Sequence, residues 1–293
     1  MSEMDPSMPP PPPRYPPPPI YPVTSDIPPQ SPYHSSAAPP RQNRGAMGWL
    51  GSAALAVWAV IKYGGLLLFK IPAAGTLLTM LVSFGAYALF YGPWFAVALI
   101  VMLFVHEMGH VVEIRRQGMR ATAPIFIPFL GAAIFQRQHA TDALKQAQIG
   151  IAGPIAGTLG ATVAAVLYTS TQNEVFLLAA WLGFFLNLLN LIPIWQLDGA
   201  WILAPVSPWL QVVGFAMIAA AVLVFHFVSI FLILIAIAGI PTLIQRFRTA
   251  SNPYYTSVPI SARWALGIAW LVLVGYLGYA FLQTSDVLSS IPR

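Results

Sequence analysis

The chain has 293 residues, of which 57% are hydrophobic and 8% are charged. Because soluble domains carry about 25% charged residues, this composition excludes a soluble enzyme with a single anchor and indicates a membrane protein with several spans. In such a protein the net charge of +5 indicates topology rather than nucleic-acid binding, and the lack of cysteine excludes disulfides and cysteine-ligated zinc.

Residues 1–46 are expected to form a disordered, proline-rich cytoplasmic tail. Prolines recur in runs at 9–13 and 16–19, and proline favours the extended polyproline II conformation. The tail has few large apolar residues, so it cannot bury a core of its own. The alternative interpretation is that it serves as a ligand for a proline-binding domain of a partner protein.

Apolar segments long enough for membrane helices follow the tail. They lie at 73–91, 94–116, 147–169, 175–193, 205–224, 227–244 and 264–282. The segment 48–70 is interrupted by Lys62 and Lys70, and we expect it to lie in the interface or re-enter rather than cross. The sequence therefore predicts an all-α polytopic membrane protein with about six or seven transmembrane helices.

Two connecting segments differ from these spans. Residues 122–135 are apolar but short, and Pro124, Pro128 and Gly131 interrupt them. We expect a short re-entrant β segment or hairpin, which is tolerated at membrane depth only where protein or water covers it. Residues 245–263 are predicted to form a polar loop. In the span 147–169, glycines recur at helical spacing and permit close helix packing, while Pro154 is expected to kink or start the helix.

The distribution of basic residues predicts the orientation. Arg115, Arg116 and Arg120 end the segment 94–116, which places that end on the cytoplasmic side. Threading the chain from there, Lys145 and the basic residues of 245–263 lie on the same side. The opposite loop at 170–174 contains neither Lys nor Arg.

The segment 94–116 also contains His106-Glu107-Met108-Gly109-His110, a His-Glu-x-x-His pattern. Residues four apart share one face of a helix, so both imidazoles can reach one metal ion. Glu107 lies beside them, where it can act on a water molecule at the metal. The pattern predicts a zinc hydrolase site inside a membrane span.

Two histidines leave such a site incomplete, because catalytic zinc usually has three protein ligands. Glu113 lies about 10 Å from His106 along the helix axis, and we expect it to pair with Arg116 or Arg120 instead. Asp198 follows the span 175–193 at the level of the motif, and a carboxylate this close to hydrocarbon indicates function. A helix cap is the structural alternative.

The other candidate ligands are less suitable. His139 is expected to be solvated, His226 to be a turn residue at the far surface, and Glu174 to lie in a loop on that far side. Within the span 175–193, Asn187 and Asn190 need hydrogen bonds if they are buried. Helix–helix contact explains either residue, but Asn190 is also a candidate for binding a substrate carbonyl or oxyanion.

Three motifs together resemble the site-2 protease family of intramembrane zinc metalloproteases. They are His106–His110, the segment Gly153-Pro154-Ile155-Ala156-Gly157, and Asn190-Leu-Ile-Pro-Ile-Trp-Gln-Leu-Asp198-Gly199, which is similar to an Asn-x-x-Pro-x-x-x-Leu-Asp-Gly motif. The resemblance covers about residues 70–245. It implies that residues 47–293 form a membrane-embedded metalloprotease domain, and that His106, His110 and Asp198 bind zinc. It also implies that Glu107 is the catalytic base and that Asn190 binds substrate.

The resemblance further implies regulated intramembrane proteolysis in a bacterial inner membrane, with the active site near the cytoplasmic side. The expected partners are the lipid bilayer and single-span membrane proteins, such as anti-sigma factors or signal peptide remnants, and no nucleic acid. Two alternatives stay open, namely a metal-binding membrane transporter and a proteolytically inactive adaptor, because intramembrane His, Asp and Asn residues also occur in ion pathways.

Overall fold

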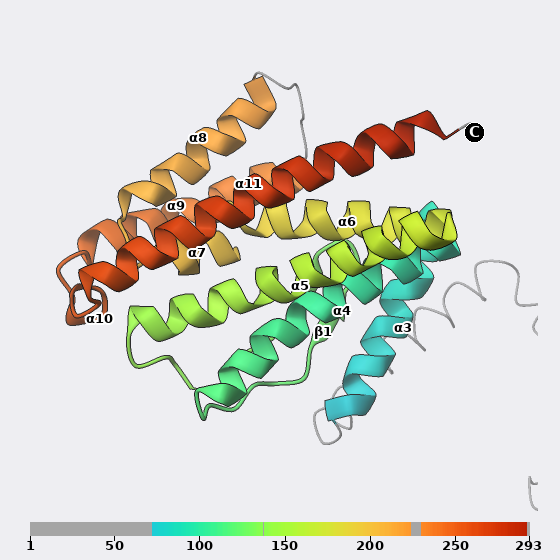
Figure 1. Cartoon of the computed structure of the whole chain (residues 1–293). Coiled ribbons are helices and arrows are strands. Elements are labelled where there is room, and N and C mark those ends of the chain that lie inside the picture. Colours follow the sequence, from blue (N-terminus) through green and yellow to red (C-terminus); the bar gives the residue numbers. More distant parts are fainter. Residues whose placement is uncertain (1–71, 137, 224–229, 292–293) are drawn as a thin grey trace, which may run out of the picture. The chain divides into compact units, whose positions relative to one another are not determined.

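The computed structural model describes residues 72–136, 138–223 and 230–291, and the described chain is mostly helical (Figure 1). The predicted tail at 1–46, the segment 48–70 and His226 lie outside these residues. The elements, in chain order, are α3 (Pro72–Tyr91), α4 (Pro93–Arg116), β1 (Ile125–Ile127), β2 (Gly131–Ala133), α5 (Ala143–Thr171), α6 (Glu174–Asn190), α7 (Asp198–Leu203), α8 (Trp209–Leu223), α9 (Ile230–Arg248), α10 (Pro253–Thr256) and α11 (Ile260–Ser290).

Four of the described helices are long and apolar enough to cross a membrane. They are α3, α4, α5 and α11, with α6 and α8 as shorter apolar helices. Many large apolar side chains on these helices are exposed, including Leu89 at 81% and Val272 at 64%. Such surfaces suit a lipid environment. The finding supports a membrane protein, but the predicted number of six or seven spans is not confirmed.

The helices α4, α5 and α6 pack against one another and position the functional site. Figure 1 shows these helices side by side, with α11 lying along α6. Small residues are fully buried at the contacts, among them Ala96, Ala161 and Ala180. Small side chains let helix backbones approach closely, which is the usual way that membrane helices associate.

Residues 122–135 form the predicted β hairpin. The strands β1 and β2 pair antiparallel with Ile125 opposite Ala133, and the turn places Phe129 and Gly131 at positive φ. The hairpin is fastened to α3, where the hydroxyl of Tyr87 accepts a hydrogen bond of 2.9 Å from the Phe129 amide. The prediction of a hairpin in this segment is confirmed.

The segment 245–263 is more ordered than predicted. Instead of one polar loop, α9 continues to Arg248, a short helix α10 follows, and α11 begins at Ile260. Asn252 caps α10 through a hydrogen bond of 2.8 Å from the Tyr254 amide, with Pro253 as the first helical residue. Asn followed by Pro is a regular helix-start signal, and the polar composition of the segment concealed it.

Pro154 lies inside α5 rather than at its start. The helix runs from Ala143 to Thr171, and Asp142 caps it by accepting a hydrogen bond from the Lys145 amide. The predicted span at 147–169 is therefore the central part of a longer helix. The additional first turn reaches beyond the apolar segment.

Candidate metal centre

The helix α4 presents His106, Glu107 and His110 to the inside of the helix cluster. Their exposed fractions are 5%, 6% and 7%. The two imidazoles lie on one face, and their Nε2 atoms are 3.1 Å apart. This is the arrangement expected from residues one helical turn apart.

Asp198 is the first residue of α7, and its carboxylate meets both histidines. Oδ2 lies 3.1 Å from Nε2 of His106, and Oδ1 lies 3.3 Å from Nε2 of His110. One ligand atom from each of the three residues lies within 4.8 Å of the other two. Residues from distant parts of the sequence thus offer two nitrogens and one carboxylate oxygen to a single point.

A close backbone contact brings Asp198 to this position. A Cβ on Gly199 would collide with the main-chain carbonyl of Leu191, so glycine is what lets α7 start against the end of α6. The same carbonyl accepts a hydrogen bond of 2.8 Å from the indole of Trp270 on α11. These contacts explain why a glycine follows Asp198 in the motif.

The hydrogen bonds of the two imidazoles fix which nitrogens face the centre. Nδ1 of His110 lies 2.8 Å from the Ile149 carbonyl oxygen, and Nδ1 of His106 lies 2.8 Å from Oδ1 of Asn187. The Asn187 amide nitrogen donates to the Gly183 carbonyl, which identifies Oδ1 as the atom facing His106. Since carbonyl oxygens only accept, each Nδ1 must carry the proton.

With the proton on Nδ1, the neutral form of each imidazole turns an Nε2 lone pair toward the centre. The Asp198 carboxylate adds further acceptors, and its Oδ2 is buried without a hydrogen-bond partner in the part of the chain that the structure describes. Acceptors that converge in a buried place repel one another unless a cation lies between them. The residues present thus fit a metal ion bound by two imidazoles and a carboxylate, a donor set that zinc accepts.

Two glycines of α5 make room for this arrangement. A Cβ on Gly153 would overlap the imidazole of His110, and a Cβ on Gly157 would overlap the Asn187 amide. The glycines predicted to permit close helix packing thus also leave space for a ligand ring and for the group that orients the other ligand.

A cavity of about 830 Å³ opens beside the centre. His106, Glu107, His110 and Asp198 line it, together with Ala132 and Ala133 of strand β2 and Asn190. Glu107 is thus placed next to the centre as predicted, and Asn190 is on the cavity wall. The cavity gives a substrate and water a place to meet these groups.

Asn187 is the residue whose part the sequence left undecided. Helix–helix contact was its simplest explanation, but the structure places it against His106. Its spacing from Asn190 was visible, yet nothing in the sequence told which amide faces the metal motif. A metal-bound histidine usually donates its second N–H to an oxygen, so an amide of this span was a suitable partner, but that expectation applies to Asn187 and Asn190 alike.

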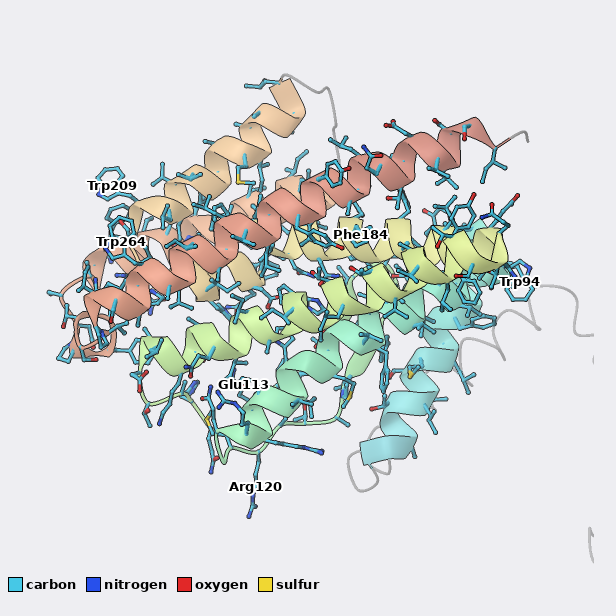
Figure 2. The ribbon with its side chains drawn as sticks, in the orientation of Figure 1. Trp94, Glu113, Arg120, Phe184, Trp209 and Trp264 are labelled. Atoms are coloured by element: carbon cyan, nitrogen blue, oxygen red, sulfur yellow. The ribbon has the colours of Figure 1, made fainter. Side chains whose placement is uncertain are left out.

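The remaining candidates lie away from the centre. Glu113 pairs with Arg116 at 2.6 Å, as predicted, and Figure 2 shows it near the end of α4, with Arg120 just beyond. Glu174 begins α6, at the end of that helix opposite to Asn190. His139 is exposed and lines the cavity, but it does not belong to the group of His106, His110 and Asp198.

Residues 94–174 match the family model of Peptidase family M50, the site-2 protease family. The matched range contains the His-Glu-x-x-His pattern and the glycines of α5 and ends before Asp198, whose place is given by the geometry above. A search of curated proteins finds no match. The resemblance inferred from the motifs is confirmed by this match, which shows that residues 94–174 are similar to a family of metallopeptidases.

Proposed function

We propose that this protein is an intramembrane zinc metalloprotease that hydrolyses peptide bonds in or near the transmembrane segments of membrane proteins. The observation that carries the proposal is the buried convergence of Asp198, from α7, with His106 and His110, which lie on a helix apolar enough to span a bilayer. Intramembrane ionisable residues are costly, and function is the usual reason for their presence.

In this proposal His106, His110 and Asp198 hold zinc with three protein ligands and leave a position for substrate. Three ligands with one open position are typical of catalytic rather than structural zinc. When bound, zinc supplies Lewis acidity for the scissile carbonyl and for water. Asn187 and the Ile149 carbonyl keep both imidazoles in the tautomer that binds metal.

Glu107 acts as the general base. Its carboxylate takes a proton from the attacking water as the water oxygen bonds to the carbonyl carbon. The same proton then goes to the amine nitrogen when the C–N bond breaks, so that a carboxylate and an amine leave. Asn190 binds a carbonyl oxygen of the substrate from the cavity wall.

The β hairpin holds the substrate chain. A transmembrane helix hides its carbonyls in internal hydrogen bonds, so it must unwind before water can attack. Strand β2 pairs with β1 along one edge, and the residues from Ala132 to Gln136 line the cavity. An unwound segment adds to the free edge of β2 through main-chain hydrogen bonds.

By its resemblance to site-2 proteases, the protein acts in a bacterial inner membrane near the cytoplasmic face. Its substrates are single-span proteins, with anti-sigma factors and signal peptide remnants as the classes to test first. The cavity between membrane helices suits such substrates, since a span can approach from the bilayer.

The test is a cleavage assay with a co-expressed single-span substrate, combined with metal analysis of the purified protein. Glu107→Gln should keep zinc and stop cleavage, because the base is lost while the ligands remain. His106→Ala should lose zinc and cleavage together. Cleavage that persists in Glu107→Gln would contradict the assignment of the base, and zinc that persists in His106→Ala would contradict the ligand set.

A further inference from the structure

Arg246 is a buried cation that the proposed mechanism does not use. It lies near the end of α9 with an exposed fraction of 6%. Its Nε and Nη2 donate to the carbonyl oxygen of Ala204 at 3.2 and 2.7 Å, and its guanidinium carbon lies 3.7 Å from the ring centre of Tyr255. Two of its nitrogens and one face are thereby occupied.

The third nitrogen of this guanidinium has no hydrogen-bond partner among the described residues. Nη1 of Arg246 is buried without a hydrogen bond, and within residues 72–136, 138–223 and 230–291 no carboxylate forms an ion pair with it. Burial lowers the pKa of Arg246, the Tyr255 phenol opposes this shift, and the cation Arg263 adds to it. A buried charge is stable only with a counter-ion, so this position calls for an anion.

Arg246 belongs to the wall of the same cavity as the metal centre. Tyr254, Tyr255 and Gln245 lie beside it on that wall. Burial raises the pKa of Tyr254 to about 12, and the charges of Tyr255 and Asp142 add to the shift. The Tyr254 phenol is therefore neutral near pH 7 and can donate a hydrogen bond to the same anion.

The helix α7 sets the spacing between the two sites. It begins at the candidate ligand Asp198 and ends at Leu203, and the carbonyl of the next residue, Ala204, accepts from Arg246. This length of helix spans about 9 Å. An extended peptide advances about 3.3 Å per residue, so the two sites are about three substrate residues apart.

We propose that Arg246 is the centre of a carboxylate-binding subsite, which recognises an Asp or Glu side chain of the substrate about three residues from the scissile bond. The inference rests on the proposed proteolytic function. The subsite would make the enzyme prefer spans with an acidic residue at a fixed distance from the cut, because an anion there pairs the free Nη1 and an uncharged side chain does not.

The first test measures binding without cleavage. Full-length Glu107→Gln protein in detergent is titrated with fluorescent, end-capped peptides that contain a single Asp at successive positions of an uncharged apolar span, or Asn at the same positions. At the matching position we expect the Asp peptide to bind about tenfold more tightly than its Asn twin. Equal affinities at every position, or no binding of any peptide, would overturn the proposal.

Two arginine variants show which group recognises the carboxylate. Arg246→Gln should abolish the preference for Asp, whereas Arg248→Gln, which removes an exposed charge from the same helix, should keep it. If Arg246 had a purely structural role, Arg246→Gln would lower the affinities for the Asp and the Asn peptides by the same factor. Zinc content checks that α7 is still in place in Arg246→Gln. If that variant does not fold, Arg246→Lys should reduce the preference, and an undiminished preference would overturn the proposal.

The source of the carboxylate and the proteolytic function are then tested separately. An uncharged peptide that ends in a free carboxylate at the matching position should bind less tightly than the Asp peptide. Tighter binding of that peptide would mean that the subsite recognises chain ends and not side chains.

With active protein, mass spectrometry should find cuts about three residues from Asp. Cuts at no fixed distance from Asp would refute the subsite alone. Selective binding of the Asp peptide without any cleavage would refute the proteolytic function alone.

Discussion

Asn187 shows how a polar residue in an apolar helix can orient a neighbouring functional group. Its amide donates to the Gly183 carbonyl at 2.6 Å and accepts from His106 at 2.8 Å. The first bond fixes the orientation of the amide, and the second fixes the proton on the imidazole. The free lone pair of His106 is therefore directed to the centre before any ion arrives.

We expect Asn187→Ala to lower zinc affinity by about 10- to 100-fold, the usual effect of removing the hydrogen-bond partner of a metal-bound histidine. Competition with chelators of graded affinity measures the change on purified protein. Asn173→Ala is the matched control, because it removes an exposed cap of α6 far from the centre. Unchanged zinc affinity in Asn187→Ala would mean that the amide serves helix packing alone.

Gly153 has no Cβ because the imidazole of His110 occupies that space. Gly153→Ala should displace the ring and reduce both zinc content and cleavage strongly, even though alanine favours helix. Gly267→Ala on α11 is the matched control, since its Cβ would meet open space and should raise helix stability by up to about 1 kcal/mol. Normal zinc content in Gly153→Ala would show that α5 can shift away from α4.

Among the elements, the sequence predicted those whose signals are local. Pro124, Pro128 and Gly131 excluded a span and indicated the hairpin, because proline and glycine act on the backbone where they stand. Asp198 could be chosen because the alternatives were few. Contacts between distant helices bury Arg246 and decide whether Asn187 or Asn190 faces His106. The sequence of a single helix does not predict such contacts.

The hairpin depends on α3 for its position, and this gives a prediction for the element as a whole. The Tyr87 hydroxyl accepts from the Phe129 amide at the turn, while the two rings also make an edge contact at 5.3 Å. Tyr87→Phe keeps the ring contact and removes the hydrogen bond, which should cost about 1 kcal/mol. Hydrogen exchange of residues 125–133 should become about fivefold faster, since 1.4 kcal/mol corresponds to a factor of ten.

Tyr279→Phe supplies the control for this change, because its ring is 65% exposed on α11 and lies outside the hairpin. It should leave exchange in the hairpin unaltered. Equal exchange in both variants and in the unmodified protein would mean that strand pairing alone holds the turn.

At the scale of the whole molecule, the basic residues gather at one end of the described helices. Gln117, just past the end of α4, donates to the carbonyl of Lys145 at the start of α5. The short helix α10, which joins α9 to α11, also contacts α5. Arg248 at the end of α9 and Arg263 near the start of α11 therefore belong to the same end as Lys145, in agreement with the threading made from the sequence.

This asymmetry predicts the orientation in the membrane, because loops rich in Lys and Arg stay cytoplasmic. The chain has no cysteine, so labelling of a single introduced cysteine shows on which side of the membrane that residue lies, without labelling of native cysteines. Ser251→Cys, in the exposed turn after α9, should react with a membrane-impermeant thiol reagent in inside-out vesicles. Ser170→Cys, exposed at the far end of α5, should react in right-side-out vesicles. The unmodified protein should react in neither. Labelling of both cysteines from one side would mean that α5 does not cross the bilayer. If Ser251→Cys reacted in right-side-out vesicles and Ser170→Cys in inside-out vesicles, the metal centre would lie near the outer face, where cytoplasmic ends of substrates could not reach it.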